Sequence, residues 1–365
     1  MVSTDVSDVV RKMDELMLKI NFFKKELKFK SPAGTSRGVL YEKPSWIFYV
    51  EEAQHIRGEC SIIPGLSLDY QSEDQFENKI KWVSQIFNSL IHSAGQVKLL
   101  SFFSNELKAF PSILFGIETL LYNLNLDRGI DPFASDFSRG EEGISINGLI
   151  WMGSSDEMLS QIGQKLDDGY SILKLKIGAI ELSKELEILK NIRDEYGKKL
   201  TIRVDANGAF GALEVEEILL ELKKYDIHSI EQPIEKGNWK LMKALCDRAI
   251  IPIALDEELI GINLSDEKKD LLQTISPQFI ILKPSLHGGI YGCSEWIEIA
   301  ESLNIDWWLT SALESNIGLE MIARFAAHYK PKIAQGLGTG GLFTNNFPSP
   351  LFIESGKLFL NNEKR

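Results

Sequence analysis

The stretch from residue 174 to residue 283 constrains the fold of this chain more than any other. It holds the apolar runs LKLKIG, RVDANG, IEQPI, ALDEEL and ILKPS, each ending at or beside a charged residue. Successive charged residues lie about 25–30 residues apart, the length of one strand, one turn and one helix. Because buried parallel strands read as apolar runs, the spacing predicts consecutive βα units whose strands end at one rim.

The charged residues at these strand ends are the candidate site. They are Lys174, Lys176, Asp205, Glu231, Asp256 and Lys283. Side chains alternate along a strand, so Lys174 and Lys176 project the same way, as do Arg203 and Asp205. Catalytic residues of a βα barrel collect at the C-terminal rim of its strands, so the carboxylates and lysines are predicted to share one cavity.

The alternation of strands and helices continues on both sides of this stretch. Residues 148–341 give eight predicted strands but seven intervening helices, which predicts the α/β class and a (β/α)₇β barrel. Residues 1–125 show strand patterns and then helical patterns, which predicts a separate α+β capping domain with residues 1–16 as a disordered extension. The segment 126–147, rich in Gly, Asp and Ser, is the predicted linker, and residues 342–365 are predicted to return to the cap.

Charge and composition exclude several classes of function. The formal net charge of −12 argues against binding nucleic acid, which needs a clustered cationic face. No run approaches the ~18 apolar residues of a membrane span, and the N-terminus lacks the basic-then-apolar plan of a signal peptide. The three cysteines show no CxxC spacing, which is typical of a reducing compartment. We therefore expect a cytoplasmic protein, and the pattern indicates no particular oligomeric state.

The three carboxylates predict a metal site. Gathered within a few ångströms, they would repel one another and drive protonation unless a cation were bound. Oxygen ligands suit a hard divalent ion, so Asp205, Glu231 and Asp256 are predicted to hold Mg²⁺, with Mn²⁺ able to substitute. Each carboxylate taken singly could be a solvated cap or loop residue, but three in consecutive units favour the metal site.

The lysines suit proton transfer beside such a metal. Lys176 has a second cation, Lys174, on the same face, which gives it a reason to lose its proton more easily than an isolated lysine. Lys283 comes from a strand further round the barrel and should approach a substrate from the opposite face. This arrangement suits removal of a proton α to a carboxylate, so the expected partner is a small-molecule carboxylate.

The order KxK, D, E, D, K, with RVDANG, IEQPI, LDEE and ILKPS, resembles the enolase superfamily and its muconate-lactonizing subgroup. The segments GECSIIPGLS, TSALESNIGLE and QGLGTGGLF add a resemblance to the o-succinylbenzoate synthases, dehydratases of menaquinone biosynthesis. That resemblance implies Mg-dependent syn dehydration of 2-succinyl-6-hydroxy-2,4-cyclohexadiene-1-carboxylate through an enediolate. Enolase-superfamily sites use a lysine or histidine base with Mg²⁺.

The resemblance also implies roles for individual residues. Lys176 would remove the proton and help expel hydroxide as water, and Lys283 would stabilise the intermediate from the far side, with Lys174 as a neighbouring cation. Asp205, Glu231 and Asp256 would hold Mg²⁺. The predicted substrate contacts are Arg203, Ser311, Ser315, Gly338 and Thr339, the last two in a turn whose glycines permit close backbone approach. Cap loops near 31–37 and 61–67 are expected to touch the substrate.

Two alternatives stay open. A racemase of N-succinylamino acids or an epimerase of dipeptides would use the same two lysines as alternating bases, and the sequence does not separate either from a dehydratase. Dipeptide epimerases of this subgroup usually carry Asp-x-Asp at strand eight, where this chain reads GLGTGG. A non-catalytic, barrel-derived binding protein is more remote, because it would be expected to lose a lysine or a carboxylate, and all six are present.

Overall fold

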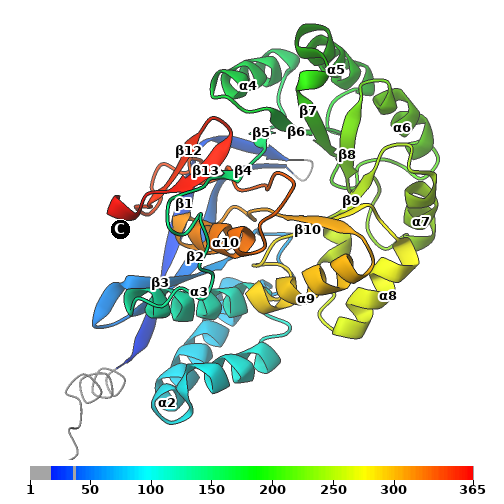
Figure 1. The fold of residues 1–365 in the computed structure, drawn as a ribbon. Coiled ribbons are helices and arrows are strands. Elements are labelled where there is room, and N and C mark those ends of the chain that lie inside the picture. The colour runs from blue at the N-terminus through cyan, green and yellow to red at the C-terminus, as the bar shows by residue number, and fades with distance from the viewer. Residues whose placement is uncertain (1–17, 36–37, 365) are drawn as a thin grey trace, which may run out of the picture.

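A computed structural model describes residues 18–35 and 38–364, so the predicted extension over residues 1–16 lies outside the described part. Figure 1 shows a curved array of strands with helices outside it, and a second group of strands and helices packed on one side. The predicted α/β class, with a (β/α)₇β barrel and an N-terminal α+β cap, is confirmed. No helix in the described ranges is long and apolar enough to cross a membrane.

The elements fall into three groups. The cap comprises β1 (Ile20–Thr35), β2 (Gly38–Val50), β3 (Ala53–Ser61), α2 (Glu73–Glu106) and α3 (Pro111–Asp127). The barrel comprises β5 (Gly148–Ile150), α4 (Ser155–Asp167), β6 (Ile172–Lys176), α5 (Leu182–Tyr196), β7 (Thr201–Asp205), α6 (Val215–Lys223), β8 (Ile227–Glu231), α7 (Trp239–Arg248), β9 (Ile253–Leu255), α8 (Ser265–Ile275), β10 (Phe279–Leu282), α9 (Gly289–Ser302), β11 (Asp306–Leu309) and α10 (Asn316–His328). A small sheet joins β4 (Ile144–Ser145), β12 (Leu351–Glu354) and β13 (Lys357–Leu360), and 3₁₀ turns lie at Gly197–Lys199, Glu257–Leu259 and Asn362–Lys364.

The barrel sheet is parallel, and its strands follow one another from β5 to β11 in sequence order. The pairing register places Lys176 opposite Asp205 and Asp205 opposite Glu231, so these charged strand ends meet at one rim. The predicted eighth strand is reduced to isolated bridges, in which Gln335 pairs with the segment before β5 and Gly336 with the segment after β11. Those bridges connect the two outer strands and close the barrel.

Local sequence signals explain where the barrel helices begin and which face they bury. At the start of α4, Ser154 Oγ accepts from the Glu157 N–H at 3.4 Å, and Glu157 Oε2 accepts from the Ser154 N–H at 2.7 Å. This capping box satisfies donors that the helix leaves unpaired. Met158 and Ile162, four residues apart, are the buried residues of α4, which packs them toward the barrel.

The cap is an antiparallel sheet, β1–β2–β3, covered by α2 and α3. Thirteen of the 17 residues of α3 are buried, because this helix packs on β3 on one side and contacts α9 and α10 of the barrel on the other. Gly58 and Gly116 let the backbones touch: a Cβ atom on Gly58 would lie 2.0 Å from Gly116 O. The apolar helix α3 therefore links the two cores of the protein.

The first part of the C-terminal segment lies along the cap. The Lys30 N–H donates to Leu342 O at 2.8 Å, and the Thr344 N–H donates to Lys28 O at 2.9 Å. Residues 342–344 therefore run beside β1, at the edge of the cap sheet.

The hairpin β12–β13 departs from the predicted course of the tail. It pairs with β4 in the predicted linker 126–147, with Leu358 opposite Ile144. The backbone of Gly356 lies against that of Gly169, which precedes β6, so the hairpin lies near the N-terminal ends of the barrel strands. The prediction that the whole tail returns to the cap is wrong for the hairpin, because β4 offers backbone groups that a strand can satisfy. The domain boundaries themselves stay a prediction.

A buried carboxylate fixes the cap to the barrel. Glu118 of α3 accepts hydrogen bonds from the Ile290 N–H at 2.5 Å and the Tyr291 N–H at 3.0 Å, in the first turn of α9. A helix N-terminus favours negative charge because its first N–H groups have no partner within the helix. Burial nevertheless raises the pKa of Glu118 to about 8, against the opposing effect of the two N–H donors.

The raised pKa predicts a pH dependence of stability that Glu118→Gln should reduce. A carboxyl whose pKa rises on folding, here from 4.5 to about 8, stabilises the fold below the lower value and loses that contribution as the pH rises through the upper one. Between about pH 5 and pH 9, the Tm of the wild type should therefore fall more than that of the variant. Calorimetric Tm values across this range test the prediction, and parallel curves for the two proteins would contradict it.

Candidate active site

A cavity of about 210 Å³ lies at the C-terminal ends of the barrel strands, beneath the cap. The cap closes it with residues from the start of β2 and from the loop after β3, which include Val39, Leu40, Ile63, Pro64 and Leu66. The loop near 61–67 therefore reaches the cavity, and its contact with the substrate stays a prediction. Cap and barrel residues both line the cavity, so its shape depends on how the cap packs on the barrel.

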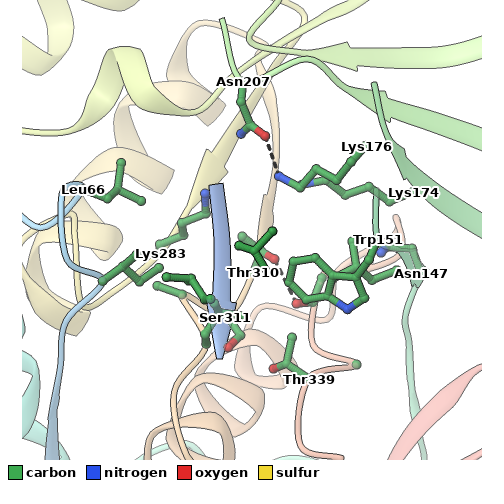
Figure 2. Close-up of a pocket in the computed structure, with 18 of the residues that line it drawn as sticks. Leu66, Asn147, Trp151, Lys174, Lys176, Asn207, Lys283, Thr310, Ser311 and Thr339 are labelled. Atoms are coloured by element: carbon green, nitrogen blue, oxygen red, sulfur yellow. Dashed lines mark hydrogen bonds between the residues drawn. The ribbon is translucent and has the colours of Figure 1, made fainter. Parts of the chain in front are cut away.

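Lysines enter the cavity from two sides. Figure 2 shows Lys174 and Lys176 extending together from one side and Lys283 from the other. Lys174 and Lys176 share a face of β6, whereas Lys283 directly follows β10. The strand alternation and the curvature of the sheet produce this opposed arrangement.

Asp205 is the most strongly paired of the carboxylates. Its Oδ2 atom lies 2.8 Å from Lys174 Nζ and 2.6 Å from Lys176 Nζ, and its side chain is fully buried. Burial alone would raise the pKa of Asp205, but the two ammonium groups hold it well below its usual value. Lys174 also pairs with Glu231. Burial would lower the pKa of Lys174, yet Asp205 and Glu231 keep it above its usual value.

Glu231 ends β8, the strand between β7 and β9, so its carboxylate lies between those of Asp205 and Asp256. Burial raises the pKa of Glu231 well above its usual value, and the Asp205 charge adds to the shift. Asp256 pairs with Lys283. Burial would raise the pKa of Asp256, but the Lys283 ammonium lowers it. The lysines that pair with the three carboxylates relieve part of the repulsion among them.

The donor set fits a hard divalent cation. Glu231 Oε1 and Asp256 Oδ1 are buried oxygens without a hydrogen-bond partner among the described residues, and such oxygens are costly to bury unpaired. A cation held by the three carboxylates would satisfy both oxygens. Within the described ranges, no three His, Cys, Asp or Glu side chains already form an assembled metal site. Here the Lys174 ammonium contacts Asp205 and Glu231 instead.

The predicted substrate contacts divide into two groups. Ser311, Gly338 and Thr339 line the cavity. Arg203 does not line it: the guanidinium lies inside the barrel, 4.2 Å from the Trp308 ring. Although Arg203 shares a strand face with Asp205, it lies two residues deeper, below the rim. Its prediction as a substrate contact is therefore not supported by its position.

Ser315 also lies outside the cavity lining. Its Oγ donates to Glu59 Oε2 at 2.6 Å and accepts from the Ile317 N–H at 3.2 Å, so it caps α10 and contacts the cap. A serine before a helix is a common N-cap. This local role explains Ser315 without a substrate.

Comparison with known proteins shows the family. A family model described as Enolase C-terminal domain-like matches residues 157–363. The chain belongs to the enolase superfamily. An o-succinylbenzoate synthase from Desulfotalea psychrophila (strain LSv54 / DSM 12343) is 42% identical over 369 residues, covering 93% of this chain and 98% of the relative. The crystal structure of MenC from Desulfotalea psychrophila LSv54 matches with a TM-score of 0.79 and 37% identity, covering 94% of this chain and 99% of that one. The muconate lactonizing enzyme from Pseudomonas putida shares the fold, with a TM-score of 0.73 and 18% identity over 94% of each chain.

In this enolase-superfamily site, Asn207 is a further polar residue, beyond those predicted from the strand ends. Its Oδ1 accepts from Lys176 Nζ at 2.8 Å, and its Nδ2 donates to Glu257 Oε1 at 2.9 Å (Figure 2 shows the first bond). Its φ of 46° is a left-handed conformation that asparagine tolerates better than most residues. The signal was present in RVDANG, because a polar residue two positions after Asp205 belongs to the same rim.

The buried pair of Asp256 and Lys283 predicts strong energetic coupling in this superfamily member. Removing one partner of a buried pair leaves an uncompensated charge, which costs about 3–5 kcal/mol, whereas removing both costs less. In buffer containing EDTA, Asp256→Asn and Lys283→Met should each lower the free energy of unfolding by about that amount. The double variant should lose no more than either single variant. Urea unfolding of the four proteins measures this, and additive losses would contradict it.

Proposed function

We propose that this protein is a carbon–oxygen lyase that dehydrates 2-succinyl-6-hydroxy-2,4-cyclohexadiene-1-carboxylate to o-succinylbenzoate in menaquinone biosynthesis, with Mg²⁺ as cofactor. The observation that carries the proposal is a cavity with lysines on opposite sides, each paired with a buried carboxylate. The 42% identity to an o-succinylbenzoate synthase over 93% of the chain supports the choice of substrate.

The charge of the cavity suits an anionic substrate. Its lining includes Lys174, Lys176 and Lys283, and none of its described lining residues is an aspartate or a glutamate. A cavity lined by one sign of charge attracts the opposite sign. The hydroxyl groups of Ser311 and Thr339 can donate to a second carboxylate, and the apolar side chains of Leu66, Trp151 and Leu313 can contact a ring.

Lys176 is the proposed base. Its neutral amine takes the proton from the carbon α to the substrate carboxylate, and the C–H electrons move into an enediolate. The resulting ammonium returns that proton to the hydroxyl group on the neighbouring carbon, the C–O bond breaks, and water leaves from the same face. Asn207 holds the Lys176 Nζ atom in position through its side-chain oxygen. Lys283, from the opposite side, contributes positive charge toward the enediolate.

Asp205, Glu231 and Asp256 are the residues that would hold Mg²⁺. When bound, the ion supplies positive charge to the substrate carboxylate on which the enediolate charge develops. The two unpaired carboxylate oxygens of Glu231 and Asp256 support this assignment, because a hard cation is the partner that such oxygens prefer. Mn²⁺, which also prefers oxygen ligands, is expected to substitute.

Racemisation of N-succinylamino acids is the second candidate. The placement of Lys176 and Lys283 on opposite sides of the cavity favours it, because each lysine could exchange the α proton of one enantiomer (Figure 2). Dipeptide epimerisation is disfavoured, since a substrate ammonium would need an acid that the described lining lacks. A binding protein without catalysis has no need for two opposed lysines beside three carboxylates.

We also propose a cytoplasmic location and a small-molecule carboxylate as the partner. Cys60, Cys246 and Cys293 are buried free thiols, which is typical of proteins kept in a reducing compartment. The net charge of −12 disfavours nucleic acid as a partner.

The metal assignment predicts dependence on a divalent ion. Purified protein incubated with the cyclohexadiene and Mg²⁺ should remove the substrate absorbance, whereas excess EDTA should abolish turnover and added Mg²⁺ should restore it. In calorimetric titration, Asp205→Asn should bind Mg²⁺ at least about tenfold more weakly than the wild type, because a ligand charge is lost. Asp247→Asn, which alters an exposed acid on α7, is the matched control. Full activity in EDTA would refute the assignment.

The two lysines should respond differently to substitution. Lys176→Arg should lose nearly all dehydration, because a guanidinium is not deprotonated at neutral pH, while Lys283→Arg should retain some, because a cation remains in place. Rates of cyclohexadiene loss measure this difference. Equal and complete loss in both variants would favour the two-base racemase. Solvent deuterium uptake into N-succinylamino acids, at one enantiomer in each variant and at both in the wild type, would establish that activity.

A further inference from the structure

The loop after β11 forms one wall of the cavity. Residues 310–313 all line it. Leu313 has a φ of 62°, a left-handed backbone conformation that a leucine rarely adopts. Such a conformation persists only where the surrounding structure holds it. The contacts that hold this loop come from two buried charged residues of the cap.

Lys43 of β2 holds the strained residue directly. Its side chain is completely buried, and its Nζ atom donates to Leu313 O at 3.0 Å. The other donors of the ammonium reach Ser61 Oγ at 2.6 Å and Ser45 Oγ at 3.3 Å, both within the cap sheet. These acceptors use all three N–H groups of the lysine, so its position is defined by the cap and by the cavity loop together.

Glu59 of β3 holds the far end of the same loop. Its Oε1 accepts from the Ser315 N–H at 2.9 Å, and its Oε2 accepts from Ser315 Oγ at 2.6 Å and from the Gly318 N–H at 3.0 Å. The carboxylate thus occupies the N-terminus of α10, where negative charge is favoured. Ser45 Oγ donates to Glu59 Oε1 at 2.8 Å and so connects Glu59 with Lys43.

Glu314 connects the restrained loop to a hydroxyl group on the cavity side. Its carboxylate accepts a hydrogen bond from Ser311 Oγ at 2.7 Å and another from Ser285 Oγ. Ser311 lines the cavity. Ser285 lies two residues after Lys283, at the end of the neighbouring strand β10. A shift of the loop relative to the cap would therefore move a cavity hydroxyl.

We propose that Lys43 and Glu59 are positioning residues through which the cap sets the conformation of residues 310–315, and with it the fit of Ser311 and Leu313 to the substrate. The identity of the fitted group, the succinyl arm, rests on the proposed dehydration. The coupling of cap and loop does not rest on it. Neither Lys43 nor Glu59 lines the cavity, so both act through the loop.

Glu118 supplies the matched control. Like Glu59, it is a buried cap glutamate that accepts backbone N–H groups at the N-terminus of a barrel helix. Its partners, Ile290 and Tyr291, are absent from the described cavity lining. If Lys43 and Glu59 served only to attach the cap, Glu118→Gln would have the same effect on substrate binding as Glu59→Gln.

The experiment compares Glu59→Gln, Lys43→Met and Glu118→Gln with the full-length wild type. For Glu59→Gln and Lys43→Met we expect the KM of the cyclohexadiene to rise about tenfold, which corresponds to ~1.4 kcal/mol, with kcat within about threefold. Hydrogen–deuterium exchange in a peptide covering residues 309–318 should be faster in both. For Glu118→Gln, KM and the exchange of that peptide should stay within about twofold. Equal KM changes in all three variants, or an unchanged peptide, would overturn the proposal.

A milder variant tests the proposal if Glu59→Gln and Lys43→Met, which remove buried charges, prevent folding. Ser315→Ala removes only a hydroxyl, which takes one hydrogen bond from Glu59 and a helix cap from α10, so a folded protein with a raised KM is expected. An unchanged KM would count against the proposal. A wild type that does not dehydrate the cyclohexadiene would refute the proposed function, whereas the exchange comparison would still decide whether Lys43 and Glu59 hold the loop.

Discussion

A cluster of buried opposite charges at the barrel rim is the constraint on which the rest of this structure depends. Ionised groups lose several kcal/mol of hydration on burial, so they persist only when they are paired or bind a cation. Asp205 and Asp256 are fully buried, and each is held by a lysine. A protein with well-packed apolar residues at such positions is often as stable as one with a buried ion pair, or more stable. Stability alone therefore does not explain the cluster. We therefore interpret it as a site kept for proton transfer.

The cap completes this site. Two buried carboxylates, each at the N-terminus of a barrel helix, fix the cap to the barrel. Glu118 and Glu59 place buried carboxylates at the N-termini of α9 and α10, which are consecutive barrel helices. These helices follow the strand ends that carry Lys283 and the loop at 310–315. Glu118 attaches the cap to the barrel, whereas Glu59 also holds the loop that lines the cavity. Exclusion of water beneath the cap strengthens every charge interaction inside the cavity.

The sequence located most of the candidate site because strand ends are a one-dimensional signal. An apolar run ending at Lys176 or Asp205 indicates a buried strand and its rim, whatever the rest of the fold does. Asn207 could have been found by the same reasoning, since it lies two residues after the strand end at Asp205. Arg203 was misjudged because strand alternation gives the face of a side chain and not its depth, and the guanidinium lies below the rim.

What the sequence by itself determined is the order of strands and helices, the barrel, and the six charged residues at its rim, because periodicity and spacing act over short distances along the chain. Only the tertiary structure decided which residues from distant segments meet. The pairing of the C-terminal hairpin with β4, and the contacts of Lys43 and Glu59 with the loop after β11, join segments more than 200 residues apart. Such contacts depend on packing between the completed cap and barrel, and no local pattern in either segment carries that information.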